Sequence, residues 1–248
     1  MRAVCSKAAG FIDIHQHVLY GVDDGPEALA EMKTMLDAAV RDGVEAIVAT
    51  PHARPGMHAF DRELCRERLF CARAYCQEHR YALHVLEGAE VLYTSGTIHE
   101  LSNGRIPTLN GTDFVLVEWP VRTDAARLSD DLRCLTNEGL IPVIAHAERL
   151  RCFWFNPEEL IRLRSELEIR IQLNAGAVLN PRNLWTGRLT RRLLKEGAAD
   201  YIASDAHNLS RRKTRMRETY RRVADEYGVS MARRLMILNQ REILARDD

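Results

Sequence analysis

The order of secondary-structure signals along the 248 residues predicts an α/β fold built on a parallel sheet. Short apolar runs alternate with longer stretches whose apolar residues recur at helical spacing, which is the pattern of repeated strand–helix units. About seven such units follow one another, and this number favours a closed or nearly closed barrel over an open doubly wound sheet. No linker or change of composition interrupts the chain. We therefore expect one domain over residues 11–248, preceded by an extension, residues 1–10.

Local signals set the bounds of these elements. Pro26 opens the first helix and Gly43 ends it, Asp61 caps the second, and Pro157 begins another. The expected strands cover residues 11–17, 45–49, 83–86, 114–117, 141–145, 169–173 and 201–203. The expected helices cover residues 28–41, 61–80, 94–102, 125–137, a stretch from Pro157, and residues 191–196, 213–227 and 230–238.

Composition excludes several functional classes. The chain has 35 basic and 35 acidic residues, so no overall positive field attracts nucleic acid. No run reaches the roughly 18 apolar residues that a membrane span needs, and the first ten residues lack the apolar core of an export signal. The six cysteines contain no C-x-x-C pair, which favours reduced thiols in a cytoplasmic protein. They are Cys5, Cys65, Cys71, Cys76, Cys134 and Cys152.

The first strand carries a pair of histidines. Side chains alternate along a strand, so His15 and His17 lie on the same face. Two protonated imidazoles would repel each other, whereas two neutral imidazoles can share a metal ion. On spacing alone, a pair of surface histidines at a strand end stays an open alternative.

Other ligand-type side chains fall at the ends of the later strands. In a parallel barrel these ends open onto one face, where active sites are built. Each residue alone has a structural explanation, such as a turn, a solvated strand end or a buried core histidine. Converging together, they would be unstable without cations, and nitrogen and carboxylate ligands suit Zn²⁺, Mn²⁺ or Fe²⁺. They are His52, Glu90, Glu118, His146, Asp205 and His207.

These residues sit in motifs that resemble the polymerase and histidinol phosphatase (PHP) superfamily, from about Phe11 to Leu244. Within it, the chain resembles the metal-dependent tyrosine-protein phosphatases of bacterial capsule and exopolysaccharide operons. Gln16 and Ala147 depart from the commoner family residues but are not ligand positions. The matching segments are His15-Gln16-His17, Asp24-Gly25-Pro26, Thr50-Pro51-His52, Gly88-Ala89-Glu90, Ile106-Pro107-Thr108-Leu109, Glu118, Ala145-His146-Ala147-Glu148-Arg149 and Ser204-Asp205-Ala206-His207.

The resemblance implies a distorted (βα)7 TIM-like barrel with three divalent metal ions, Mn²⁺ in the first place, with Zn²⁺ or Fe as alternatives. Glu90 is expected to bridge the first two ions. The implied ligands are His15, His17, Glu90 and Asp205 for the first ion, Glu90, Glu118 and His146 for the second, and Asp24, His52 and His207 for the third.

Such a site predicts attack of a metal-activated hydroxide on a phosphomonoester. Arg149 is expected to hold the phosphate and stabilise transition-state charge, although its position also suits a surface arginine. His58 is a candidate general acid. No cysteine is followed by arginine six positions on, as thiol-based tyrosine phosphatases require, and no P-loop motif occurs.

The resemblance implies a phosphotyrosine-bearing protein as substrate, with the tail of a bacterial tyrosine autokinase as the expected partner. The alternatives are a small-molecule phosphatase of the histidinol-phosphate type, a PHP nuclease, and a non-catalytic binding module. The basic residues at positions 211–217 are read as a solvated helix face, or alternatively as a rim that attracts an acidic tail. The oligomeric state is left open.

Overall fold

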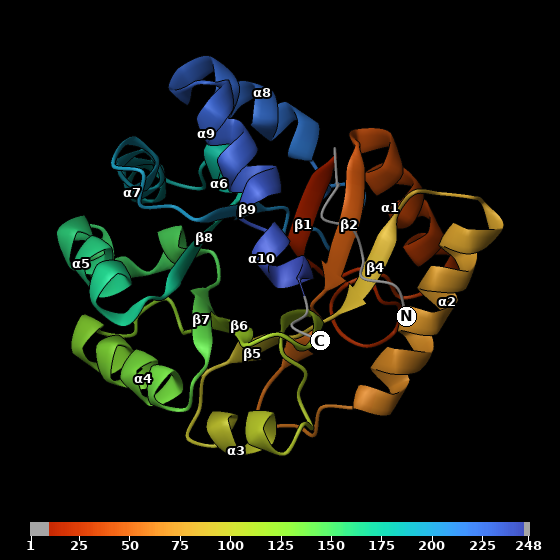
Figure 1. Cartoon of the computed structure of the whole chain (residues 1–248), viewed down its shortest axis with the longest axis horizontal. Coiled ribbons are helices and arrows are strands. Elements are labelled where there is room, and N and C mark those ends of the chain that lie inside the picture. Colours follow the sequence, from red (N-terminus) through yellow and green to blue (C-terminus); the bar gives the residue numbers. More distant parts are fainter. Residues whose placement is uncertain (1–9, 246–248) are drawn as a thin grey trace.

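The computed structural model describes residues 10–245, so the predicted extension, apart from Gly10, lies outside the described residues, as does Cys5. Strands and helices alternate along the chain (Figure 1). The strands are β1 Phe11–Gln16, β2 Val44–Ala49, β3 His52–Ala53, β4 His84–Glu87, β5 Glu90–Leu92, β6 Phe114–Glu118, β7 Ile141–Ile144, β8 Arg170–Asn174 and β9 Tyr201–Ala203. The α-helices are α1 Leu29–Asp42, α2 Arg62–Glu78, α3 Thr97–Ser102, α4 Ala125–Asn137, α5 Pro157–Leu167, α6 Ala175–Leu179, α7 Leu184–Lys195, α8 Met216–Tyr227, α9 Val229–Arg233 and α10 Arg241–Leu244.

Every strand pairing is parallel, as the strand–helix alternation predicts. The order is β1-β2-β4 in one sheet and β3-β5-β6-β7-β8-β9 in the other. The strands curl, and the helices cover the outside of the curl (Figure 1). The free edge of β1 meets the chain just after β9 through a parallel bridge between Gln16 and Ala206. The predicted α/β class is therefore confirmed as a curled parallel sheet.

Two interruptions divide the curl into its two sheets. The chain leaves β2 at Thr50-Pro51, where proline has no N–H to donate to a ladder, and resumes as β3. It leaves β4 at Gly88-Ala89 and resumes as β5. A side chain at Gly88 would meet Val48 Cγ1 at 2.6 Å, so the close approach of these strands requires glycine. These interruptions were not predicted from the sequence.

The apolar core forms two clusters. The larger packs the outer faces of the strands against the helices, with Leu36 of α1 and Leu128 of α4 fully buried. The smaller includes Ile14 and Leu116 and is joined by Ile243 of α10, which lies within the curl in Figure 1. This smaller cluster fills one end of the curl with apolar side chains. The polar side chains gather at the carboxyl ends of the strands.

Several predicted helix bounds were wrong. The helix predicted over residues 191–196 begins at Leu184, because the Asn183 side chain accepts hydrogen bonds from the amides of Trp185 and Thr186. The helix predicted from residue 213 begins at Met216. The last predicted helix splits into α9 and a π-helical turn, Arg234–Leu238.

Among residues 10–245, no helix combines the length and the apolar character that crossing a bilayer demands. The five cysteines in this range are free.

Candidate active site

The carboxyl ends of the strands bring the predicted ligand residues into one cluster. β1 supplies His15 and leads into His17, β3 begins at His52, β5 begins at Glu90, and β6 ends at Glu118. Contacts of 4.0 Å or less connect all nine predicted ligand residues. The four others follow a strand or precede α1; they are Asp24, His146, Asp205 and His207.

Glu90 lies at the centre of the cluster and is 1 % exposed. Its Oε1 is 2.8 Å from His146 Nε2 and 3.3 Å from His15 Nε2. Its Oε2 is 2.9 Å from His52 Nδ1 and 3.3 Å from His17 Nε2. One carboxylate thus faces four imidazoles, with each oxygen directed to a different pair. The bridging role expected of Glu90 stays a prediction.

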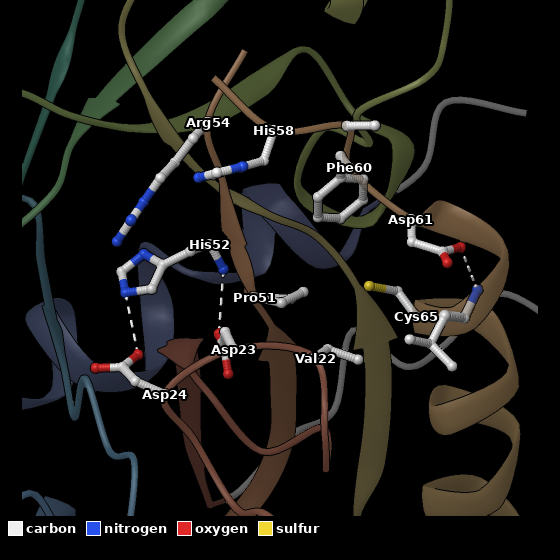
Figure 2. Close-up of a pocket in the computed structure, with 12 residues that line it drawn as sticks. Val22, Asp23, Asp24, Pro51, His52, Arg54, His58, Phe60, Asp61 and Cys65 are labelled. Atoms are coloured by element: carbon white, nitrogen blue, oxygen red, sulfur yellow. Dashed lines mark hydrogen bonds and ion pairs between the residues drawn. The ribbon is translucent and has the colours of Figure 1, made fainter. Parts of the chain in front are cut away.

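Two further groups flank Glu90. His15 Nε2 and His17 Nε2 are 3.3 Å apart and lie 3.5 and 3.7 Å from Asp205 Oδ1. Asp24 Oδ1 lies 3.2 Å from His52 Nε2 and 3.1 Å from His207 Nε2 (Figure 2 shows the His52 contact).

The donor set fits divalent metal ions. Buried His52 Nδ1, Glu90 Oε2 and His207 Nε2 lie within 3.1 Å of another cluster atom, but none of these contacts has the angles of a hydrogen bond. Buried polar atoms are normally satisfied, and a cation would satisfy these. The donor atoms form three groups, and within each group they lie within 4.8 Å of one another. His17 and His52 each belong to two of these groups, whereas the expected grouping shared only Glu90. These groups are His15, His17 and Asp205; His52, Glu90 and Glu118; and His17, Asp24, His52 and His207.

The pKa values show how the cluster is neutralised without metal. Burial alone would lower the pKa of His17, but Asp23 and Glu90 outweigh it and raise that pKa to about 10. Burial opposes ionisation of Glu90 too, yet the surrounding imidazoles hold its pKa well below the usual range. Protonated imidazole therefore takes the place that a cation would take, and metal binding must release these protons.

Two other imidazoles are held neutral. Burial, aided by the Arg149 guanidinium, lowers the pKa of His146 to about 4. Burial, aided by His17, lowers the pKa of His207 to about 4. Neutral imidazole is the ligand form of histidine, so these two side chains are ready to bind a metal at neutral pH.

Two cluster residues have strained backbones. His146 has φ 35° and Asp205 has φ 53°, both in the left-handed region that non-glycine residues rarely adopt. The His146 amide donates to Gln172 Oε1 at 2.8 Å, and the Asp205 amide donates to the His15 carbonyl at 2.8 Å. These hydrogen bonds turn both side chains into the cluster directly after β7 and β9.

Sequence reasoning missed the role of Asp23. His17 Nδ1 donates to Asp23 Oδ2 at 2.6 Å, which orients the imidazole, and the pKa of Asp23 falls to about 2 despite its burial. The adjacent Asp24 is 57 % exposed at its side chain and faces the cluster rim. Gly25 allows this turn, because a Cβ there would lie 2.5 Å from the His17 carbonyl oxygen. The Asp-Asp pair was visible in the sequence, but not which carboxylate is buried.

Two buried amides on β8 were also missed. Gln172 accepts from His15 Nδ1 at 3.2 Å and donates to Asn174 Oδ1 at 2.9 Å. Asn174 in turn donates to Asp205 Oδ2 at 2.6 Å. This chain fixes the orientation of two candidate ligands, a role that commonly falls to the residues behind a metal site. Their position at the end of an apolar strand was the signal.

Arg149, the predicted phosphate-binding residue, donates to Asp205 Oδ2 at 2.6 Å and is 22 % exposed at its side chain. Arg212 makes a matching contact from the opposite side, 2.7 Å from Asp205 Oδ1 and 3.3 Å from Asp24 Oδ2. The preferred interpretation of residues 211–217 as a helix face was wrong for Arg212. α8 begins only at Met216, so the preceding loop turns this arginine toward the cluster.

Two cavities adjoin the cluster on different sides. Pocket 1, of about 470 Å³, contacts Asp24 and His52 and is also lined by His58 and Phe60 (Figure 2). Pocket 2, of about 350 Å³, contacts Asp205. Its cationic lining residues are Arg149, Arg182, Arg211, Arg212, Lys213 and Arg215.

Known proteins share both the sequence and the fold. Residues 11–245 match the family model described as "Capsular polysaccharide synthesis, CpsB/CapC". The chain is 32% identical to the tyrosine-protein phosphatase CpsB of Streptococcus pneumoniae over 238 residues, which cover 94% of this chain and 98% of that protein. It is 31% identical to the tyrosine-protein phosphatase YwqE of Bacillus subtilis, over 95% of this chain and 92% of that protein.

A structural match agrees with the sequence matches. Crystal structures of YwqE and CpsB, described as unique metal-dependent tyrosine phosphatases, include a chain that superimposes with a TM-score of 0.82 at 30% identity, covering 89% of both chains. A phosphotriesterase homology protein from Escherichia coli, with a TM-score of 0.62 and 8% identity over 96% of this chain and all of that one, shares the fold alone. The chain therefore belongs to the CpsB/CapC family of capsular polysaccharide synthesis proteins.

Proposed function

We propose that this protein is a metal-dependent protein-tyrosine phosphatase. The observation that carries the proposal is the cluster of nine histidine and carboxylate side chains around Glu90, with two arginines at its edge. Relatives about 31% identical over most of the chain are named tyrosine-protein phosphatases. The same evidence favours a hydrolase over a binding module, because a scaffold has no need to bury this many ionisable groups.

We propose that the cluster holds three divalent ions, Mn²⁺ in the first place, with Zn²⁺ or Fe as alternatives. His15, His17, Glu90 and Asp205 would hold one ion, Glu90, Glu118 and His146 a second, and Asp24, His52 and His207 a third. Bound ions would lower the pKa of a water molecule and supply hydroxide at neutral pH. Asp23, Gln172 and Asn174 keep the ligand side chains oriented.

Arg149 and Arg212 would bind the phosphoryl group. Both guanidinium groups donate to Asp205, so they already converge on one edge of the cluster. A planar guanidinium can donate two parallel hydrogen bonds to phosphate oxygens and stabilise the charge that develops on them. The chain would need no nucleophilic side chain, because water activated at the cluster would be the attacking group.

The partner would be a phosphotyrosine-bearing protein, and we propose the tail of a bacterial tyrosine kinase. The lining of pocket 2 favours an acidic partner. It includes Arg182, Arg211 and Lys213, and among the described residues no carboxylate oxygen lies within 4.0 Å of their charged nitrogens. Uncompensated cations in a cavity attract anions and accelerate their association.

We also propose a cytoplasmic location and action as one domain over residues 11–248. We further propose a (βα)7 barrel, in which β2 with β3 and β4 with β5 each count as one strand.

The test is phosphate release by the purified protein from p-nitrophenyl phosphate and from phosphotyrosine peptides. We expect activity that a chelator abolishes, that added Mn²⁺ restores, and that iodoacetamide leaves intact. Burial raises the pKa of the Cys65 thiol to about 12 and that of Cys76 to about 11, so neither is a nucleophile at neutral pH. Activity that resists chelators and is lost on alkylation would contradict the proposal. A higher kcat/KM on histidinol phosphate would favour the small-molecule alternative.

A further inference from the structure

Pocket 1 has two unlike sides. Asp24 and His52 of the ligand cluster lie on one side with Arg54, and the apolar residues Val22 and Phe60 lie on the other, next to Asp61 and Cys65 (Figure 2). Pro51 is buried, and Phe60 is half-buried and packs against the larger core cluster, so this side rests on a rigid base. A group bound at Asp24 and His52 therefore has an apolar surface within reach in one direction only.

The size of the cavity suits an aromatic ring with its attached chain. A cavity of about 150 Å³ accommodates benzene, and pocket 1 offers about 470 Å³. Pocket 2 suits the anion better than the ring, since six cationic side chains line it. The two cavities thus separate the parts of an aryl phosphate, with the anion toward the arginines and the ring toward Phe60.

We propose that pocket 1 is the aryl subsite of this enzyme and that Phe60 is the residue that favours phosphotyrosine over alkyl phosphates. The inference rests on the proposed function and adds the basis of its selectivity. Phe60 would contact the tyrosyl ring edge-to-face or offset, as aromatic pairs prefer. Pro51 and Val22 would cover the remaining faces of the ring.

The first test measures binding without turnover. Phenylphosphonate and methylphosphonate, which carry no hydrolysable ester, are titrated calorimetrically into the metal-loaded protein. We expect Phe60→Ala to weaken phenylphosphonate about tenfold, consistent with the loss of an aromatic contact and its buried area. Methylphosphonate affinity should stay within twofold. Phe60→Leu keeps apolar volume, so its affinity for phenylphosphonate should lie between those of the wild type and of Phe60→Ala. Phe70→Ala is the matched control, because Phe70 is exposed on α2 away from the pocket lining.

The second test compares kcat/KM on a phosphotyrosine peptide and on its phosphoserine counterpart. Phe60→Ala should reduce only the phosphotyrosine value, in a variant whose circular dichroism spectrum matches that of the wild type. An equal loss on both ligands, or no loss on phenylphosphonate, would overturn the aryl subsite. A wild-type protein that hydrolyses no phosphotyrosine would instead overturn the proposed function, so the two failures are distinguishable.

Discussion

Pocket 1 and pocket 2 touch the same cluster but differ in the balance of apolar and charged residues that line them. Pocket 1 combines an apolar wall around Phe60 with three aspartates, two histidines and one arginine, whereas pocket 2 collects six cationic side chains around Asp205 and Glu148. The chain as a whole has a formal net charge of zero, so this asymmetry is local. The difference teaches that a chain without net charge can still place an apolar wall on one side of a ligand cluster and a concentration of cations on another.

Removing a residue of the ligand cluster that both pockets adjoin should have the largest effect. We expect His146→Asn to reduce kcat on phosphotyrosine peptides by about 10³-fold or more, as loss of a central catalytic group commonly does. Asparagine is chosen because it tolerates the left-handed backbone at His146 better than alanine. His84→Asn, at an exposed strand position, is the control. Circular dichroism checks the fold, and a variant that keeps a tenth of its activity would contradict the ligand role.

Changing the phosphate side should affect all substrates alike. Arg149→Lys removes the planar donor pair, and we expect kcat/KM to fall about 10²-fold on aryl and alkyl phosphates equally. This uniform loss contrasts with the selective loss expected for Phe60→Ala. Arg151→Lys, two residues further on and exposed, is the control. A loss confined to aryl substrates would show that the two pockets are not divided as proposed.

The rim of pocket 2 should act through long-range charge. We expect Arg182→Gln to lower kcat/KM about 3- to 10-fold for phosphopeptides with acidic flanks, with little change for neutral ones. The effect should shrink in high salt, because exposed charges are screened. Arg192→Gln removes a similar charge outside the pocket, where Arg192 pairs with Glu158. If Arg182→Gln and Arg192→Gln lowered kcat/KM equally, the loss would come from net charge and not from the rim of pocket 2.

The smallest effect concerns the start of α2, the helix that carries the pocket 1 residues Leu64 and Cys65. Arg62 and Arg66 at the start of α2 outweigh the burial of Glu87 and lower its pKa from 4.5. A lowered pKa means that the stabilisation is present above pH 4.5 and is lost as the pH falls through the folded-state pKa. We expect Glu87→Gln to cost about 1 kcal/mol at pH 7. Urea unfolding checks this, and a difference that persists undiminished at pH 3 would contradict it.

The sequence predicted the parallel α/β class and the positions of the polar strand ends because both depend on local patterns. Apolar runs followed by histidine, aspartate or glutamate mark where each strand stops. In a parallel sheet these ends share one edge, so His15, Glu90 and Asp205 could be expected together despite their separation in the chain. The interruptions at Pro51 and Gly88 were not predictable from periodicity, since they depend on contacts between strands.

The residues around the ligands were harder to predict. Gln172 and Asn174 are uncharged, and their role depends on a buried chain of hydrogen bonds that no local pattern shows. Asp23 and Asp24 are identical neighbours, distinguished only by the turn at Gly25. Arg212 belonged to a basic run that suits a solvated helix face, and only the late start of α8 turns it inward.

The bridge between Gln16 and Ala206 joins the first strand to the chain after the last one. His15 and Asp205, on either side of this seam, are separated by most of the chain, so an emerging nascent chain lacks a complete site until nearly all of it has been synthesised. Metal capture would then coincide with the final closing of the protein. Ions that bind only the closed form stabilise the whole molecule in proportion to the logarithm of their concentration. Metal supply would thereby govern the lifetime of the folded protein as well as its activity.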